Sequence, residues 1–125
     1  MTKLLIVDDV HEYLDSLSRA LGGEYEVITA TNLEEAKAKV NDTIKLALVD
    51  VRLSEAEATN RDGVSFLLWL KQNFPKVPVI MMSAYSDFDA AIDSLNYGAS
   101  RYLKKPINLR ELKELINALT KEAGS

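Results

Sequence analysis

The 125 residues of this chain include 15 basic and 19 acidic side chains, giving a formal net charge of −4, and no cysteine. This length suits a single domain over residues 1–125, whose core needs no disulfide or structural metal. The composition excludes thiolate metal sites, the negative charge argues against direct nucleic-acid binding, and no apolar run is long enough to cross a membrane. The amino-terminal apolar stretch is too short for a signal peptide, so a soluble cytoplasmic domain is expected.

Apolar runs alternate with segments of helical periodicity in the first half of the chain. A continuous apolar run over residues 3–7 is typical of a strand that is covered on both faces. Apolar side chains at helical spacing predict a helix over residues 10–21, and residues 24–29 predict a second strand. A short helix is expected over residues 31–40, and residues 44–50 form a third apolar run that ends on an acid.

The second half of the chain continues the same alternation after a break. Residues 51–63 carry no sustained periodicity and are expected to form a loop. Pro75 ends the helix that follows this loop, because proline cannot continue a helical hydrogen-bond ladder. The remaining elements are predicted as helix, strand, helix, strand and helix over residues 64–73, 77–83, 88–97, 100–104 and 109–119.

Two of the predicted helices begin with the spacing of a capping box. In this motif a short polar side chain and a glutamate three residues later bond to backbone N–H groups of the first turn. Thr31 with Glu34 predicts the start of the second helix, and Asn108 with Glu111 predicts the start of the last one.

The strict alternation of five strands with five helices predicts an α/β fold with a parallel sheet and helices on both faces. In such sheets functional residues lie beyond the carboxyl ends of the strands. Polar side chains follow or end four of the predicted strands at these positions: Asp8, Asp9, Asp50, Ser83 and Lys105. One edge of the sheet is therefore expected to gather them.

Four motifs give the sequence a family resemblance: "VDD" at 7–9, "ALVDVRL" at 47–53, "MMSAY" at 81–85 and "GASRYLKKP" at 98–106. Together they resemble the receiver domain of response regulators, the phosphoacceptor module of two-component signalling. The resemblance covers essentially the whole chain. It implies a flavodoxin-like fold with a five-stranded parallel sheet of order 2-1-3-4-5.

The resemblance assigns a chemical task to each residue of the candidate site. Asp50 is the expected nucleophile, whose carboxylate takes a phosphoryl group as an acyl phosphate. Mg²⁺ is the expected cofactor, because a hard cation with oxygen ligands neutralises converging carboxylates. Its implied ligands are Asp8, Asp9, Asp50 and the backbone carbonyl of Arg52. Lys105 is expected to offer its ammonium to a phosphoryl oxygen.

Further residues are expected to transmit or tune the signal. By resemblance, Ser83 offers its hydroxyl to the phosphoryl group, and Tyr102 is the switch aromatic that turns inward in response. The same resemblance implies that Arg52 and Tyr85 border the site. Lys104 stands beside Lys105, but a strand alternates its faces, so only one of the two can point into the site. The family pattern selects the lysine that precedes proline.

The segment after Asp50 departs from the family pattern. A serine, Ser54, stands where receiver domains usually have proline, and Gly63 follows Asp50 by thirteen positions, which is longer than usual. Extra loop length costs little stability. The hypothesis is that the acidic, polar loop over residues 54–62 restricts access to the site or contacts a specific partner.

Three functions remain open from the sequence. The first is a phosphoacceptor switch, which catalyses only its own phosphorylation and dephosphorylation. The second is a Mg²⁺-dependent phosphatase with an aspartyl nucleophile, although Arg52 stands where such enzymes carry a second aspartate. The third is a receiver-like interaction module that does not use phosphate. A P-loop nucleotide site is disfavoured because no glycine-rich loop with Lys-Ser/Thr is present.

The resemblance also implies partners. A histidine kinase or a histidine phosphotransfer protein is the expected donor, and the downstream effector or output domain is not identified by the sequence. Receivers with this kind of last helix often form homodimers, here through the helix at 88–97, the strand at 100–104 and the helix at 109–119.

Overall fold

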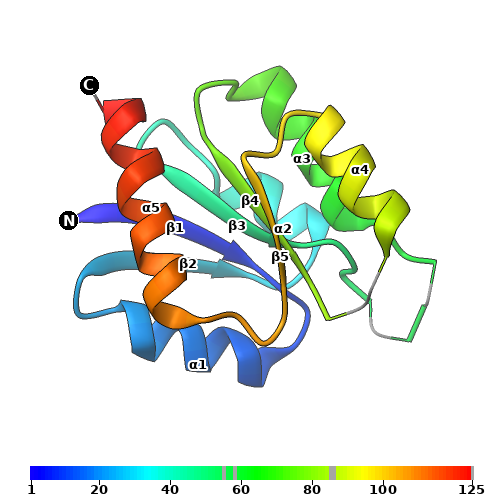
Figure 1. Cartoon of the computed structure of the whole chain (residues 1–125), viewed down its shortest axis with the longest axis horizontal. Coiled ribbons are helices and arrows are strands. Elements are labelled where there is room, and N and C mark those ends of the chain that lie inside the picture. Colours follow the sequence, from blue (N-terminus) through cyan, green and yellow to red (C-terminus); the bar gives the residue numbers. More distant parts are fainter. Residues whose placement is uncertain (55, 58, 85–86, 125) are drawn as a thin grey trace.

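The computed structural model describes residues 1–54, 56–57, 59–84 and 87–124. Its centre is a parallel sheet with the strand order β2-β1-β3-β4-β5, shown in Figure 1. The α/β class and the order 2-1-3-4-5 are thereby confirmed. The strands are β1 (Thr2–Val7), β2 (Tyr25–Ala30), β3 (Leu46–Asp50), β4 (Val79–Ser83) and β5 (Arg101–Lys104).

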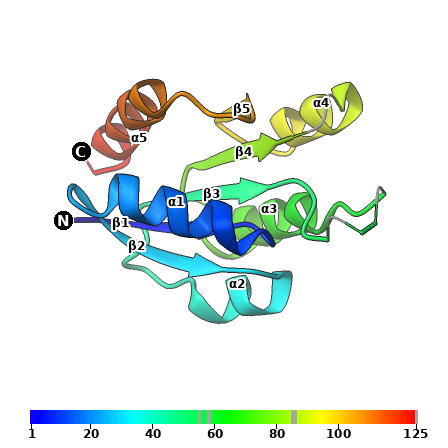
Figure 2. The same cartoon turned by 90° about the horizontal axis from the view of Figure 1, so that it is seen from below.

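Helices cover both faces of this sheet (Figure 1, Figure 2). They are α1 (His11–Leu21), α2 (Leu33–Lys39), α3 (Asp62–Asn73), α4 (Phe88–Asn96) and α5 (Leu109–Gly124). Successive side chains of a strand point to opposite faces. Accordingly, Leu4 and Ile6 of β1 belong to the core beneath α1 and α5, whereas Leu5 and Val7 belong to the core beneath α2, α3 and α4. None of the helices in the described ranges is long and apolar enough to span a membrane.

The register of the strands brings their carboxyl ends to one edge. Val7 pairs with Val49, the residue before Asp50, and Asp50 pairs with Met82, the residue before Ser83. Ser83 in turn pairs with Lys104. Because all four strands run in the same direction, the polar residues at their ends lie side by side at the edge where the sequence predicts the site.

Two helix starts differ from the sequence prediction. The cap of α2 is Asn32, not Thr31: the Asn32 Oδ1 accepts the N–H of Glu35 at 2.8 Å, and the Glu35 Oε1 accepts the N–H of Thr31 at 2.9 Å. Thr31 with Glu34 and Asn32 with Glu35 both have the spacing of the motif, and the structure uses the pair Asn32 and Glu35. Helix α3 begins at Asp62, two residues earlier than expected, because the residue that follows β3 holds its first turn: the Gly63 N–H donates to the carbonyl of Val51 at 2.9 Å.

Candidate functional site

Three carboxylates converge at the carboxyl edge of the sheet. Asp8 and Asp9 follow β1, Asp50 is the last residue of β3, and one oxygen from each lies within 4.8 Å of the others. Asp8 is fully buried, Asp50 is 6% exposed, and Asp9 is half-buried. Asp8 accepts the N–H of Val10 at 2.9 Å and Asp50 accepts the N–H of Arg52 at 3.0 Å. Asp8 and Asp50 therefore each fix the turn that follows their own strand.

Lys105 joins two of these acids. Its ammonium donates to the Asp8 Oδ2 at 2.6 Å and to the Asp50 Oδ2 at 2.7 Å. The lysine side chain is largely buried, as both its partners are. The neighbouring Lys104 is exposed, so of the two adjacent lysines it is Lys105 that reaches the acids, as the alternation of strand faces predicts.

The electrostatics of this cluster follow from its burial. Burial raises the pKa of the Asp50 carboxyl to about 6; the hydrogen bond from Lys105 opposes this rise and the charge of Asp8 adds to it. Burial alone would lower the pKa of the Lys105 ammonium, but its bonds to Asp50 and Asp8 outweigh burial and raise it. Proximity to a second carboxylate and removal from water both disfavour the charged form of an acid.

The charge and donor types of this cluster fit a divalent hard cation. When all groups are ionised, three carboxylates and one ammonium leave a formal charge of −2. Carboxylate oxygens are the ligands that Mg²⁺ uses in proteins. The described residues at this edge thus match the charge and the chemistry of the expected cofactor.

Ser83 and Tyr102 lie next to each other beside the acids. Ser83 is the last residue of β4 and is buried, and its carbonyl accepts the N–H of Lys105 at 2.8 Å. Tyr102 of β5 has a buried hydroxyl. Burial raises the pKa of this hydroxyl, and its interaction with the Ser83 side chain opposes the rise. The register pairs Met81 with Tyr102, so Ser83, two residues after Met81, lies on the same face of the sheet as Tyr102.

One member of the site is not found by sequence reasoning. Tyr13 of α1 places its ring 4.2 Å from the Lys105 Nζ, which is the geometry of a cation–π contact. The sequence shows Tyr13 only as one apolar position of an amphipathic helix. Of the two expected bordering residues, Arg52 is half-buried beside Asp50, and Tyr85 lies outside the described residues.

Hydrogen bonds to the side chain of Asn60 hold together the two ends of the segment between β3 and α3. The Asn60 Oδ1 accepts the N–H of Leu53 at 2.9 Å and the N–H of Asp62 at 3.0 Å, which closes the loop between them. Gly63 then packs so tightly on β3 that a Cβ there would lie 1.7 Å from the Asp50 carbonyl oxygen. The loop hypothesis also involves residues 55 and 58, which lie outside the described residues.

Comparison with known proteins gives a consistent family. The response regulator receiver domain family matches residues 4–117. The chain is 37% identical over 111 residues to the DNA-binding transcriptional regulator NtrC of Escherichia coli, and 34% identical over 116 residues to the response regulator protein PilR of Pseudomonas aeruginosa. A solved CheY-like response regulator receiver domain protein from Methanospirillum hungatei superposes with a TM-score of 0.88 at 32% identity, covering 99% of this chain and 97% of that one.

The curated relatives are much longer than this chain. The two matches cover 89% and 91% of this chain but 23% and 25% of NtrC and PilR. The chain thus spans about a quarter of the length of the curated relatives it matches.

Proposed function

This chain belongs to the response regulator receiver domain family, and from this membership we propose that Asp50 is the residue that accepts the phosphoryl group. The observation that carries the proposal is the bridge that Lys105 makes between the buried carboxylates of Asp8 and Asp50. Burying two acids is unfavourable unless a cation compensates them. Such an arrangement is expected where phosphate and metal charge must be balanced.

We propose that Asp8, Asp9 and Asp50 hold Mg²⁺, together with the backbone carbonyl of Arg52. The fit rests on the donor set, three carboxylates with one oxygen each inside 4.8 Å. When bound, the cation supplies positive charge that offsets the acids and the oxygens of the transferred phosphoryl group.

The proposed donor is a phosphohistidine of a histidine kinase or of a histidine phosphotransfer protein. A carboxylate oxygen of Asp50 attacks phosphorus, the P–N bond to the donor imidazole breaks, and the imidazole nitrogen keeps the electron pair and takes a proton from water. The product is an acyl phosphate on Asp50, which water later hydrolyses. Positioning and charge neutralisation, more than covalent assistance, decide the rate of this kind of step.

Lys105 and Ser83 have complementary tasks in this scheme. The Lys105 ammonium, held in place by two carboxylates, can transfer one of its hydrogen bonds from Asp50 to an oxygen of the incoming phosphoryl group. The Ser83 hydroxyl donates to another oxygen, and this changes its interaction with Tyr102. The signal then leaves through the surface of α4, β5 and α5, which we also propose as the surface for homodimerisation or effector binding.

The proposal is tested with acetyl phosphate as a small phosphodonor in the presence of Mg²⁺. The wild-type chain is expected to acquire one hydroxylamine-labile phosphoryl group, the Asp50→Ala variant none, and the Ser83→Ala variant one. Label that persisted without Asp50 would overturn the assignment. Catalytic turnover of simple phosphate esters in the same samples would instead favour an aspartyl phosphatase.

A further inference from the structure

We propose that Arg61 is a positioning residue that holds α4 in its resting place and ties it to the strand that carries Asp50. The inference rests on the proposed function, because it concerns how the phosphorylated site moves α4. Arg61 lies at the end of the segment that is longer here than in the family, and nothing in its sequence context marks it.

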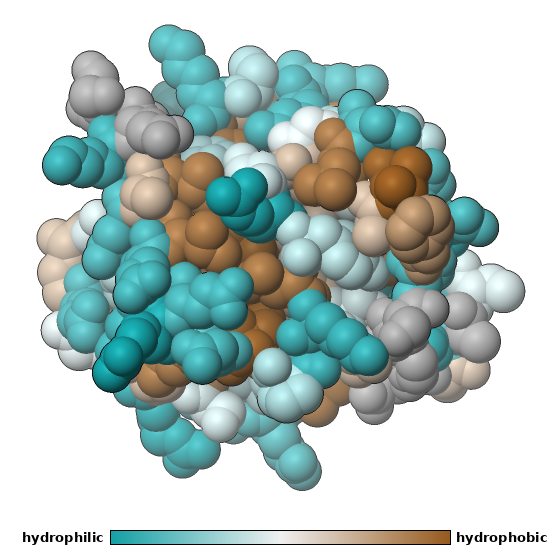
Figure 3. All heavy atoms as spheres, viewed as in Figure 1, coloured by the Kyte–Doolittle hydropathy of each residue, from teal (hydrophilic) through white to brown (hydrophobic). Residues whose placement is uncertain are grey.

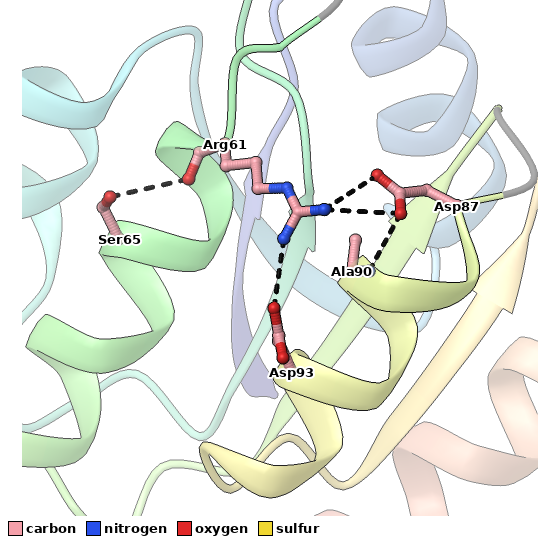
Figure 4. A network of polar contacts seen from close by, with 5 residues as sticks. All are labelled: Arg61, Ser65, Asp87, Ala90 and Asp93. Carbon is pink, nitrogen blue, oxygen red and sulfur yellow. Dashed lines mark hydrogen bonds and ion pairs between the residues drawn. The ribbon is translucent and has the colours of Figure 1, made fainter.

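The side chain of Arg61 bridges two acids of α4, as Figure 4 shows. Its Nη1 donates to the Asp93 Oδ2 at 3.1 Å, and its Nη2 donates to the Asp87 Oδ2 at 3.2 Å. Asp87 is the N-cap of the helix, where its Oδ1 accepts the N–H of Ala90 at 2.9 Å. One guanidinium thus contacts the start of α4 and a position well inside it, which fixes both the place and the direction of the helix.

The backbone of Arg61 is itself firmly attached. Its carbonyl accepts the N–H groups of Val64 at 3.0 Å and Ser65 at 3.1 Å, in the first turn of α3. The first turn of α3 is attached to the end of β3 and to the residue after it: Gly63 packs against the carbonyl of Asp50, and the Gly63 N–H donates to the carbonyl of Val51. Arg61 therefore links the end of β3 to α4 through a backbone that is itself held by hydrogen bonds.

Other contacts hold α4 weakly. All nine of its residues are described, and of these only Ala90 and Ser94 are buried. The buried Ser94 hydroxyl has no hydrogen-bond partner among the described residues. Apolar side chains that could anchor the helix face outward, at Phe88, Ile92 and Leu95, and Figure 3 shows apolar surface over this region. Because so little apolar area is buried beneath α4, the ion pairs to Arg61 are a large part of its attachment.

The position of Asp87 connects the Arg61 ion pairs to the proposed switch residue Ser83. Asp87 follows Ser83 by four residues, so a shift of Ser83 towards a phosphoryl group on Asp50 pulls on the start of α4. Arg61 resists this movement of α4, because its own backbone is attached to the end of β3 through the first turn of α3. Phosphorylation and release of Arg61 are therefore coupled, and each must favour the other by the same factor.

The first test measures amide hydrogen exchange of α4 in the unphosphorylated chain. Arg61→Gln is expected to speed exchange in α4 by roughly three- to thirty-fold, the range for losing two partly exposed ion pairs, and to leave β2 and α2 unchanged. Asp87→Asn keeps an N-capping oxygen and loses the charge, so it should reproduce part of the effect, as should Asp93→Asn. Arg19→Gln, an exposed arginine of α1, is the matched control and should change nothing in α4.

The second test measures the affinity of the Mg²⁺-loaded chain for beryllofluoride, a phosphoryl analogue. Arg61→Gln should bind it more tightly, by about the factor seen in exchange, and Arg61→Lys should lie between, since one ammonium cannot grip both acids. Added salt should loosen α4 in the wild-type chain and not in Arg61→Gln.

The outcomes separate the two proposals. Unchanged α4 exchange in Arg61→Gln would overturn the present inference alone. Faster exchange with unchanged beryllofluoride affinity would also overturn it, because Arg61 would then be only a structural brace. A wild-type chain that bound no beryllofluoride would overturn the proposed function.

Discussion

At the scale of single residues, the candidate site weakens the fold that carries it. Asp50 is buried, and burial together with Asp8 holds its pKa at about 6, above the ordinary value near 3.8. When the pKa of a carboxyl is higher in the folded chain than in the unfolded chain, ionisation of that carboxyl lowers the free energy of unfolding. Neutral pH therefore costs the metal-free protein stability, and bound cation is expected to restore it.

Replacing Asp50 by asparagine removes this charge and keeps an oxygen for the Arg52 N–H. The metal-free Asp50→Asn variant is expected to be more stable than the wild type by roughly 1–3 kcal/mol at pH 7, the order of magnitude that corresponds to the raised pKa. The difference should shrink as the pH falls through about 6, where the wild-type carboxyl is protonated. Urea unfolding in EDTA measures the stability difference at pH 7 and its change with pH. Asp15→Asn, on the exposed face of α1, is the control. A destabilised Asp50→Asn variant would contradict this account.

Tyr13 makes a contact across the fold with the proposed catalytic lysine, Lys105. Its ring lies 4.2 Å from the Lys105 ammonium, and a partly desolvated contact of this kind is worth about 0.5–2 kcal/mol. Tyr13→Leu is expected to slow phosphorylation by acetyl phosphate by roughly three- to thirty-fold, because Lys105 loses a side chain that holds its direction. Tyr13→Phe keeps the ring and should retain most of the rate; equal loss in both variants would show that the hydroxyl matters instead.

At the scale of elements, the join between β3 and α3 decides where Asp50 and Arg61 stand. Gly63 approaches the Asp50 carbonyl so closely that no side chain fits. Sequence spacing does not reveal such a requirement, because the approach depends on how the loop after Asp50 closes. The capping of α2 has a similar cause: Thr31 and Asn32 both match the motif, and backbone geometry chooses Asn32.

Gly63→Ala tests this join. Its Cβ would lie 1.7 Å from the Asp50 carbonyl oxygen, so α3 must move away from β3, and we expect a loss of about 1–3 kcal/mol in the free energy of unfolding. The variant should also be phosphorylated more slowly, because the strand that carries the proposed acceptor Asp50 is displaced. Gly23→Ala is the control, since nothing lies within 4 Å of its added Cβ. Equal stabilities for the two variants would refute the close approach.

At the scale of the whole molecule, the order of strands explains why the sequence predicts most of the site. Asp8, Asp50 and Lys105 each follow or end an apolar run, and a parallel sheet brings such ends to one edge. Arg61 and Tyr13 escape prediction for a physical reason. Their partners lie 26 to 97 residues away or on another face, as with Asp87 for Arg61, and no local periodicity records such contacts.

Alkaline stability depends on tyrosines spread over the molecule. Burial raises the pKa of the hydroxyls of Tyr13, Tyr25 and Tyr102, and Tyr25 donates to the Asn117 Oδ1 at 2.6 Å, linking β2 to α5. Because the pKa of each hydroxyl is higher in the folded chain than in the unfolded chain, the protonated tyrosines stabilise the fold fully below about pH 10. This stabilisation is lost as the pH rises through the folded pKa values. The free energy of unfolding should fall above pH 10, and less steeply in Tyr25→Phe. Parallel pH profiles would contradict this.

The most direct test of the central claim is to locate the phosphoryl group. The chain is treated with acetyl phosphate and Mg²⁺, reduced with borohydride, which converts an aspartyl phosphate to homoserine, and mapped by mass spectrometry. We expect homoserine at position 50, and none when EDTA replaces Mg²⁺ or when Asp8 and Asp9 are both changed to asparagine. Homoserine at another aspartate, or equal labelling in EDTA, would contradict a magnesium-dependent acceptor built from the acids of β1 and β3.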